Sequence, residues 1–200
     1  QQLGLSTDTF VISCIAELIS RKNHRQLLFA LKKFTEVNRH VQCLFVGDGE
    51  MEQTLKELVN ELGLVQFVQF LGSRDDIPHI LRATDVCVLL SKQEGLPRVV
   101  MEAMAAGLPV IATDIRGNSD LITHGRNGFL VPYGDVAATA VALQKLYKYP
   151  ELRRRMGRIN KKHVMQYDIS RIVPQMTQIY LKESDEREQD GPLSAVRETI

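Results

Sequence analysis

The chain has 200 residues, of which 44% are hydrophobic and 24% are charged, and its formal net charge is +1. This composition is typical of a globular domain with a sizeable core, and the near-neutral charge argues against a nucleic-acid-binding protein. No apolar run approaches the roughly 20 residues that a membrane-spanning helix requires, so we expect no such helix.

The first half of the chain alternates short apolar runs with longer amphipathic stretches. Residues 10–16, 41–46 and 65–71 are apolar runs that do not alternate internally, which predicts strands buried on both faces of a parallel sheet. Helices are predicted over residues 24–37 and over residues 50–62, just before a glycine. The apolar face of the first helix comprises Leu27, Leu31, Phe34 and Val37.

The second half of the chain continues the same pattern. Further strands are predicted at residues 86–90, 109–112 and 129–131. Further helices are predicted at residues 76–83, 97–106, 134–147, 150–167 and 170–182.

Alternating strands and helices predict a Rossmann-like, doubly wound α/β domain over residues 1–183. Such a sheet binds its ligands beyond the carboxyl ends of the strands, so the residues that follow each strand are the candidates for a site. Residues 184–200 are polar and lack a sustained period, and we expect them to form a disordered tail.

Gly47-Asp48-Gly49-Glu50 follows a predicted strand and opens a predicted helix, as a dinucleotide-binding fingerprint would. The third glycine of that fingerprint is missing, because Glu52 occupies its position. Asp48 and Glu50 would also crowd a phosphate at the helix start. We interpret the segment as a tight turn whose acidic residues complement the helix dipole.

The cysteines and histidines offer little for metal binding. Cys14, Cys43 and Cys87 each lie within an apolar run, and no histidine belongs to a cluster at metal-ligand spacing. We expect reduced core cysteines, no metal site and no cofactor. Reduced cysteines also favour a cytoplasmic location.

The most informative segment is residues 91–107, which contains Glu94 and Glu102 in an E-x7-E spacing. Pro97 is predicted to begin a helix, whose first N–H groups are suited to an anionic diphosphate, and Gly95 would let the backbone approach a ligand closely. Glu102 lies within an otherwise apolar helix, where a carboxylate needs a partner. That partner is either a ribose diol of a ligand, or a neighbouring backbone group or arginine.

In context, the segment reads E-G-L-P-x-x-x-x-E-A-M-A-A-G-L-P-V-I-A and resembles the signature of the family 4 (group 1) glycosyltransferases of GT-B fold. Similar pieces occur in the family's order at residues 44–50, 70–72, 75–77, 83–86, 117–122 and 127–132. The resemblance covers roughly residues 5–183. It is greatest for members that build capsular polysaccharide, exopolysaccharide or O-antigen, because Glu17-Leu18 and Lys22-Asn23-His24 match their first loop.

The resemblance implies that this chain is the C-terminal, donor-binding half of a two-domain enzyme, with the N-terminal acceptor domain absent. By position, Lys22 would neutralise the donor's diphosphate as the glycosyl bond breaks, and Glu94 would orient the transferring sugar. Glu102 would hold the ribose hydroxyls. The other positions implied to line the donor site are Glu17, Gly72, Ser73, Arg74, Gly95, Leu96, Pro97, Arg98 and Val99.

One position departs from the family. Its usual Gly-Arg pair after the first strand reads Ala16-Glu17 here, so Lys22 is the one cation that the motif places there, with Arg98 and Arg116 as candidates to assist. The departure slightly favours a non-catalytic nucleotide- or ligand-binding module of the same fold. The intact Lys22, Glu94 and Glu102 favour an enzyme. Glycoside hydrolysis is disfavoured, because both glutamates lie along one loop–helix segment rather than across a sugar.

We therefore expect a retaining glycosyltransferase that moves a hexose from a UDP-sugar, or as second choice a GDP-sugar, to a saccharide or lipid-linked acceptor in polysaccharide biosynthesis. No metal is expected to be required, and the fragment alone is expected to bind the donor without turnover. The expected location is the cytoplasm, at the inner face of the membrane where the missing half makes peripheral contact.

Overall fold

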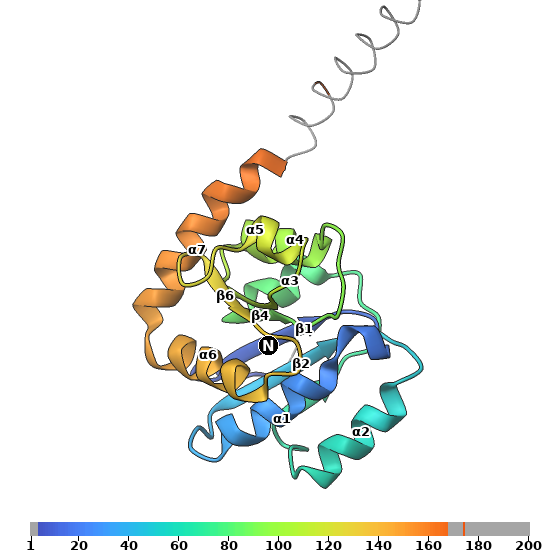
Figure 1. Cartoon of the computed structure of the whole chain (residues 1–200). Helices are drawn as coiled ribbons and strands as arrows, with labels where there is room; N and C mark the ends of the chain where they lie inside the picture. Colours follow the sequence, from blue (N-terminus) through green and yellow to red (C-terminus); the bar gives the residue numbers. More distant parts are fainter. Residues whose placement is uncertain (1–3, 168–173, 175–200) are drawn as a thin grey trace, which may run out of the picture. The chain divides into compact units, whose positions relative to one another are not determined.

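A six-stranded parallel sheet, flanked by helices, forms from strands within residues 10–131 (Figure 1). The computed structural model describes residues 4–167 and residue 174. The strands are β1 (Phe10–Ile15), β2 (Val41–Val46), β3 (Val68–Phe70), β4 (Val86–Leu89), β5 (Val110–Thr113) and β6 (Gly128–Val131). Their spatial order, β3-β2-β1-β4-β5-β6, is that of doubly wound nucleotide-binding sheets, which confirms the predicted fold class.

Helices cover both faces of this sheet. Those on one face are α1 (His24–Thr35), α2 (Glu52–Glu61) and α6 (Val136–Lys148), and those on the other are α3 (Ile77–Arg82), α4 (Arg98–Ala106) and α5 (Asn118–Leu121) (Figure 1). Helix α7 (Pro150–Val164) packs against α4. Two short 3-10 helices, η1 (Ser20–Lys22) and η2 (Met165–Tyr167), complete the described elements.

The chain divides into two compact units, Gln1–Val164 and Met165–Ile200, and the first holds the whole sheet. Its main core joins the even-numbered residues of β1 to α1, α2 and α6, and a second cluster packs Val11 of β1 against Ile80 of α3. Strands β1, β2, β4 and β5 are almost completely buried, as predicted. The helix predicted at 170–182 and the tail at 184–200 lie outside the described residues. Within the described residues, no helix is both long enough and apolar enough to cross a bilayer.

Two predicted boundaries are wrong. The strand predicted from residue 65 begins only at Val68, because residues 64–67 form a turn in which the Phe67 N–H donates to the Leu64 carbonyl, and Val65 is 63% exposed. The first helix ends at Thr35, where the Asn38 side chain donates to the Phe34 carbonyl. Val37 is therefore 76% exposed instead of lying on the buried face.

The sequence patterns also missed η1 and α5. Each spans three or four residues, which is too short to show a hydrophobic period. By contrast, the predicted end of α4 at Gly107 is confirmed, since this glycine adopts φ 82° and its N–H donates to the Met104 carbonyl. The start of α6 is confirmed as well, because the Asp135 carboxylate accepts a hydrogen bond from the Ala138 N–H.

Candidate functional site

The candidate site lies where the strand order reverses, between the carboxyl ends of β1 and β4. Ligands of doubly wound sheets bind in the crevice outside the strand ends at this point. The chain after β1 crosses one face of the sheet and the chain after β4 crosses the other, in two separate loops. They are joined by one backbone hydrogen bond, from the Lys92 N–H to the Arg21 carbonyl, of 2.8 Å. The loops carry residues 16–23 and 90–97.

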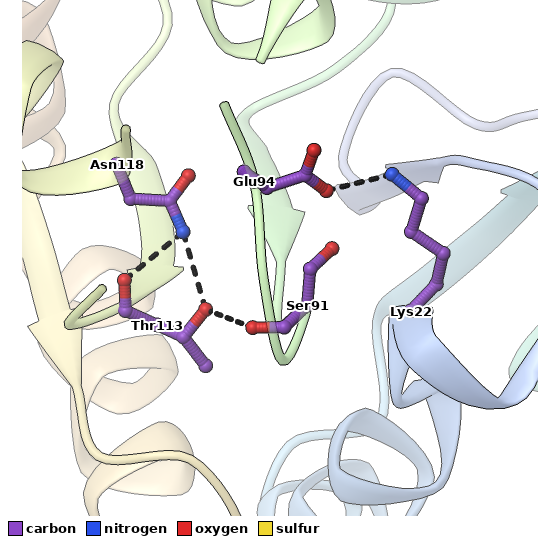
Figure 2. A network of polar contacts seen from close by, with 5 residues as sticks. All are labelled: Lys22, Ser91, Glu94, Thr113 and Asn118. Carbon is purple, nitrogen blue, oxygen red and sulfur yellow. Dashed lines mark hydrogen bonds and ion pairs between the residues drawn. The ribbon is translucent and has the colours of Figure 1, made fainter. Parts of the chain in front are cut away.

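Lys22 and Glu94 meet in this crevice (Figure 2). The Lys22 Nζ lies 2.6 Å from the Glu94 Oε1, and the two side chains are only 15% and 10% exposed. Because little water reaches them, the attraction between the two charges is screened less than at the surface. The two residues that the family resemblance assigned to catalysis are therefore in direct contact, 72 positions apart in sequence.

The ion pair determines what the site can do. Without a ligand, the Glu94 carboxylate neutralises the Lys22 ammonium. An anionic ligand that approaches this pair would offer Lys22 a second negative partner, and the Glu94 carboxylate would have further lone pairs to accept hydrogen bonds from hydroxyl groups. A charged amine beside a hydroxyl acceptor suits a ligand with an anionic group next to a sugar.

The sequence left open whether Glu102 pairs with a ribose diol or with a neighbouring backbone group or arginine. In the structure its partner is an arginine. The Arg98 Nε donates to the Glu102 Oε1 at 2.8 Å, one helical turn earlier, and the arginine side chain is 88% exposed. Such an exposed pair is weak, worth about 0.3–0.5 kcal/mol. It leaves the glutamate, whose side chain is 33% exposed, accessible to a ligand that competes with Arg98.

The loop between Glu94 and α4 is open toward solvent. Gly95 has free space where a side chain would start, and Leu96 is 49% exposed. Pro97 is the N-cap of α4 rather than its first helical residue, and no described side chain caps this helix. The N–H groups of Arg98 and Val99 at its start therefore remain suited to an anion.

In the described part of the chain, no hydrogen bond or ion pair joins the other predicted donor-site residues to the Lys22–Glu94 pair. Gly72, Ser73 and Arg74 follow β3, and the Arg74 guanidinium makes two hydrogen bonds to Asp76, of 2.7 and 2.8 Å. This arginine holds the pKa of the Asp76 carboxyl below its usual value. Glu17 is exposed after β1. Their assignment to the donor site stays a prediction.

The glycines after β2 serve a close contact with the β1 loop. A side chain on Gly47 would collide with the Ala16 carbonyl, and one on Gly49 would start 2.6 Å from the Leu18 carbonyl oxygen. The Met51 N–H donates to that same Leu18 carbonyl at 2.8 Å. The Gly-x-Gly segment is therefore a turn against the β1 loop, in agreement with its interpretation from sequence.

Sequence reasoning missed the polar residues that hold the β1 loop. Among the described residues, Asn23 is the one non-glycine with positive φ, 53°, and it follows Lys22 directly. Its side chain donates to the Gln26 Oε1, which also accepts from the Gly134 N–H, while the Gln26 Nε2 donates to three oxygens of residues 132–139. The available signal was a glutamine among the apolar residues of α1, next to Leu27 and Leu28.

Buried titratable groups near the site are held neutral. Burial lowers the pKa of His24 to about 4, helped by the charge of Lys22, and its ring packs edge-on against Phe45. Burial raises the pKa of the Cys87 thiol to about 12 and that of Cys14 and Cys43 well above the usual value. Within residues 4–167, no three His, Cys, Asp or Glu side chains are grouped as a metal site.

A cavity of about 540 Å³ lies away from this crevice, beside α3 and the amino ends of β1 and β4. Leu5, Thr9 and Asp85 are among the residues that line it. Ligands of doubly wound sheets bind beyond the carboxyl ends of the strands. We therefore take the Lys22–Glu94 crevice, rather than this cavity, as the candidate site.

Comparison with known proteins places most of the chain in one protein family. Residues 1–163 match the family model described as Glycosyl transferases group 1. A Bacillus subtilis protein named as a glycosyltransferase, EpsD, is 39% identical over 177 residues, which are 88% of this chain and 46% of EpsD. The Escherichia coli UDP-Gal:alpha-D-GlcNAc-diphosphoundecaprenol alpha-1,3-galactosyltransferase is 33% identical over 90% of this chain and 47% of its own.

A solved structure also resembles this chain in its fold. The crystal structure of Anabaena Alr3699/HepE in complex with UDP-glucose superposes with a TM-score of 0.84 at 29% identity, covering 90% of this chain and 50% of that one. The chain thus spans about half the length of the relatives that it matches.

Proposed function

Because the chain belongs to the group 1 glycosyltransferases, we propose that it is the nucleotide-sugar-binding half of a retaining enzyme that transfers a hexose from a UDP-sugar. The acceptor would be a saccharide or a lipid-linked saccharide in polysaccharide biosynthesis. A GDP-sugar is the second choice of donor. A relative bound to UDP-glucose and another named for UDP-Gal support UDP over GDP.

The observation that carries this proposal is the Lys22–Glu94 pair at the strand-order switch point. Its Glu94 lies in the loop that leads into the uncapped amino end of α4. During transfer, an acceptor hydroxyl oxygen would bond to the anomeric carbon as the bond between that carbon and the diphosphate oxygen breaks. The diphosphate would leave with the electron pair of the broken bond, and the proton of the acceptor hydroxyl would pass to it. Lys22 would neutralise the charge that develops on it, and the N–H groups of Arg98 and Val99 would help. These fixed charges require no metal ion.

Glu94 would have two successive tasks. Before binding it keeps the Lys22 ammonium in place, and with the donor bound it would accept hydrogen bonds from sugar hydroxyls and orient the anomeric carbon toward the acceptor. Glu102 would exchange Arg98 for the ribose hydroxyls. A cytoplasmic site of action, at the inner face of the membrane, belongs to the same proposal.

The direct test is donor binding by this chain. Calorimetric titration should show weak binding of UDP and UDP-glucose, and weaker binding of GDP-hexoses. Lys22→Ala should reduce the affinity, whereas Lys56→Ala, which removes a lysine with an equally short 2.6 Å pair on the exposed face of α2, should not. If neither nucleotide binds at millimolar concentration, the proposal is wrong. Retention would be tested by proton NMR of the anomeric product of the full-length enzyme.

The alternative is a nucleotide- or ligand-binding module without catalysis. It is favoured by Glu17, an exposed acid where the family usually has an arginine. A full-length protein that binds UDP-glucose but transfers no sugar, and gains no activity from Glu17→Arg, would establish this alternative.

A further inference from the structure

The donor loop, residues 91–97, is held from two sides. On the β1 side it is held by the Lys92–Arg21 backbone bond and by the Lys22–Glu94 pair. On the β5 side the contacts come from residues to which the family resemblance assigned no role.

The first contact from the β5 side is a buried hydrogen-bond chain (Figure 2). The Thr113 hydroxyl at the end of β5 donates to the Ser91 carbonyl at 2.6 Å, where the donor loop begins. The Asn118 Nδ2 donates to the Thr113 carbonyl and hydroxyl, at 3.0 and 3.1 Å. All three residues are completely buried, so these bonds are protected from water and fix the first residue of the loop.

The second contact is a backbone against backbone approach. Gly117 has φ 89°, and a side chain there would collide with the Gly95 carbonyl and start 2.8 Å from the Glu94 carbonyl oxygen. Neither carbonyl belongs to a flexible side chain that could move away. The turn after β5 therefore supports the donor loop directly behind the residue that pairs with Lys22.

We infer that Thr113, Gly117 and Asn118 are positioning residues of the donor site, which set the place of Glu94 and Gly95 relative to Lys22. This inference rests on the proposed function. The three residues act through the loop, since Gly117 and Asn118 are buried beneath it and Thr113 ends a buried strand. An error of about 1 Å in such a loop is enough to weaken the function of a site by orders of magnitude.

The chain offers a matched pair of glycines for the test. Gly117→Ala forces a methyl group against the donor loop. Gly125→Ala places the same methyl group at a similar backbone angle, φ 76°, with nothing within 4 Å. Both variants carry the strain of alanine at positive φ, so both should lower Tm, and only the first should affect the loop.

Two measurements separate the variants. In the ligand-free chain, NMR should show shifts of the Glu94 and Gly95 amides and of the Lys22 ammonium signal for Gly117→Ala, and none for Gly125→Ala. Calorimetry should show UDP-glucose affinity reduced at least about 10-fold for Gly117→Ala and kept within about twofold for Gly125→Ala.

A second pair of variants covers the case in which Gly117→Ala does not fold. Thr113→Val keeps the shape of the side chain but removes the hydroxyl, and Thr113→Ser restores the hydroxyl. The valine variant should shift the same NMR signals and lose affinity, and the serine variant should recover both. A role in stability alone would lower Tm without moving the Lys22 signal.

The outcomes separate the two proposals. If the unmodified chain binds no UDP-glucose, the proposed function is wrong, and the Lys22 signal alone decides the inference. If the unmodified chain binds and both Gly117→Ala and Thr113→Val leave the affinity and the Lys22 signal unchanged, the inference is wrong and the proposed function stands.

Discussion

Buried polar groups beyond the amino ends of the strands and those beyond the carboxyl ends differ in whether they have hydrogen-bond partners. We call these two sides of the sheet its amino edge and its carboxyl edge. At the amino edge, the Asn160 side chain on α7 donates to the carbonyls of Leu108 and Asn127, at 2.6 and 2.8 Å, and accepts from the Asn127 Nδ2 at 2.8 Å. The Asn127 Oδ1 accepts from the Thr123 N–H. Gly157 adds a backbone contact with Gly107. Every polar atom of the two asparagine side chains is thus bonded.

At the carboxyl edge, polar groups are left open. The Ser91 Oγ and the Asn118 Oδ1 are buried without a hydrogen-bond partner in the part of the chain that the structure describes. Asn23 holds a strained backbone angle beside Lys22, and α4 begins without a side-chain cap. Such features cost stability, and proteins retain them mainly where a ligand or a reaction requires them. Mutations at the two edges should therefore separate stability from donor binding.

The largest effect is expected at the amino edge. Asn160→Ala would leave the Leu108 and Asn127 carbonyls and the Asn127 amide without their partner, so the free energy of unfolding should fall by about 3 kcal/mol. UDP affinity of the folded protein should be unchanged. Urea unfolding measures the first and calorimetry the second, with the exposed Asn60→Ala as control. Weaker UDP binding by the folded variant would mean that the two edges are coupled.

At the carboxyl edge, Lys22→Ala should act on turnover. In the full-length enzyme kcat should fall by ~100-fold or more, about 2.7 kcal/mol, by analogy with the loss of one oxyanion donor. KM should change less, because in the proposed reaction the lysine would interact most strongly with the leaving diphosphate. Steady-state kinetics with Lys56→Ala as control would show this. If kcat stays within about threefold of normal, Lys22 does not stabilise the leaving diphosphate, and Arg98 is the next candidate for that role.

His24 should make stability depend on pH. Its pKa is lowered to about 4 in the folded chain, whereas an unfolded histidine has a pKa of about 6.5. The folded state therefore favours the neutral ring, and as pH falls below about 6.5 the unfolded state gains the proton first. The resulting loss of stability should reach about 2 kcal/mol at pH 5 and level off below pH 4. Urea unfolding of His24→Phe should lack this part of the pH dependence; an unaltered profile would contradict the assignment.

The smallest effect is expected at Glu102. Because Arg98 already occupies this carboxylate, exchange for the ribose hydroxyls should contribute only roughly 1–2 kcal/mol, and Glu102→Gln should weaken UDP binding by that amount. Tm should change little. The control is Glu52→Gln, which weakens another exposed pair one helical turn apart, with Lys56, and should also change Tm little. If Tm falls and UDP affinity does not, Glu102 serves the helix alone.

Local sequence patterns were enough for most of the fold. The apolar runs of β1, β2, β4 and β5 lie buried as predicted, because a strand covered on both faces excludes polar residues along its whole length. Gly107 ended α4 for an equally local reason, its tolerance of positive φ. The E-x7-E segment, together with the shorter pieces in the same order, indicated the family, since each piece lies within a few consecutive residues.

The contacts between distant segments could not be predicted from local patterns. Lys22 and Glu94 meet because β1 and β4 are neighbours in the sheet, an order that no local pattern encodes. The support of the donor loop by Thr113, Gly117 and Asn118 depends on β5 lying beside β4. Periodicity alone located most of the strands and helices, although not η1, α5 or the start of β3. The pairing of the strands decided which loops share a crevice, because hydrophobic periodicity records burial and not the neighbour that provides it.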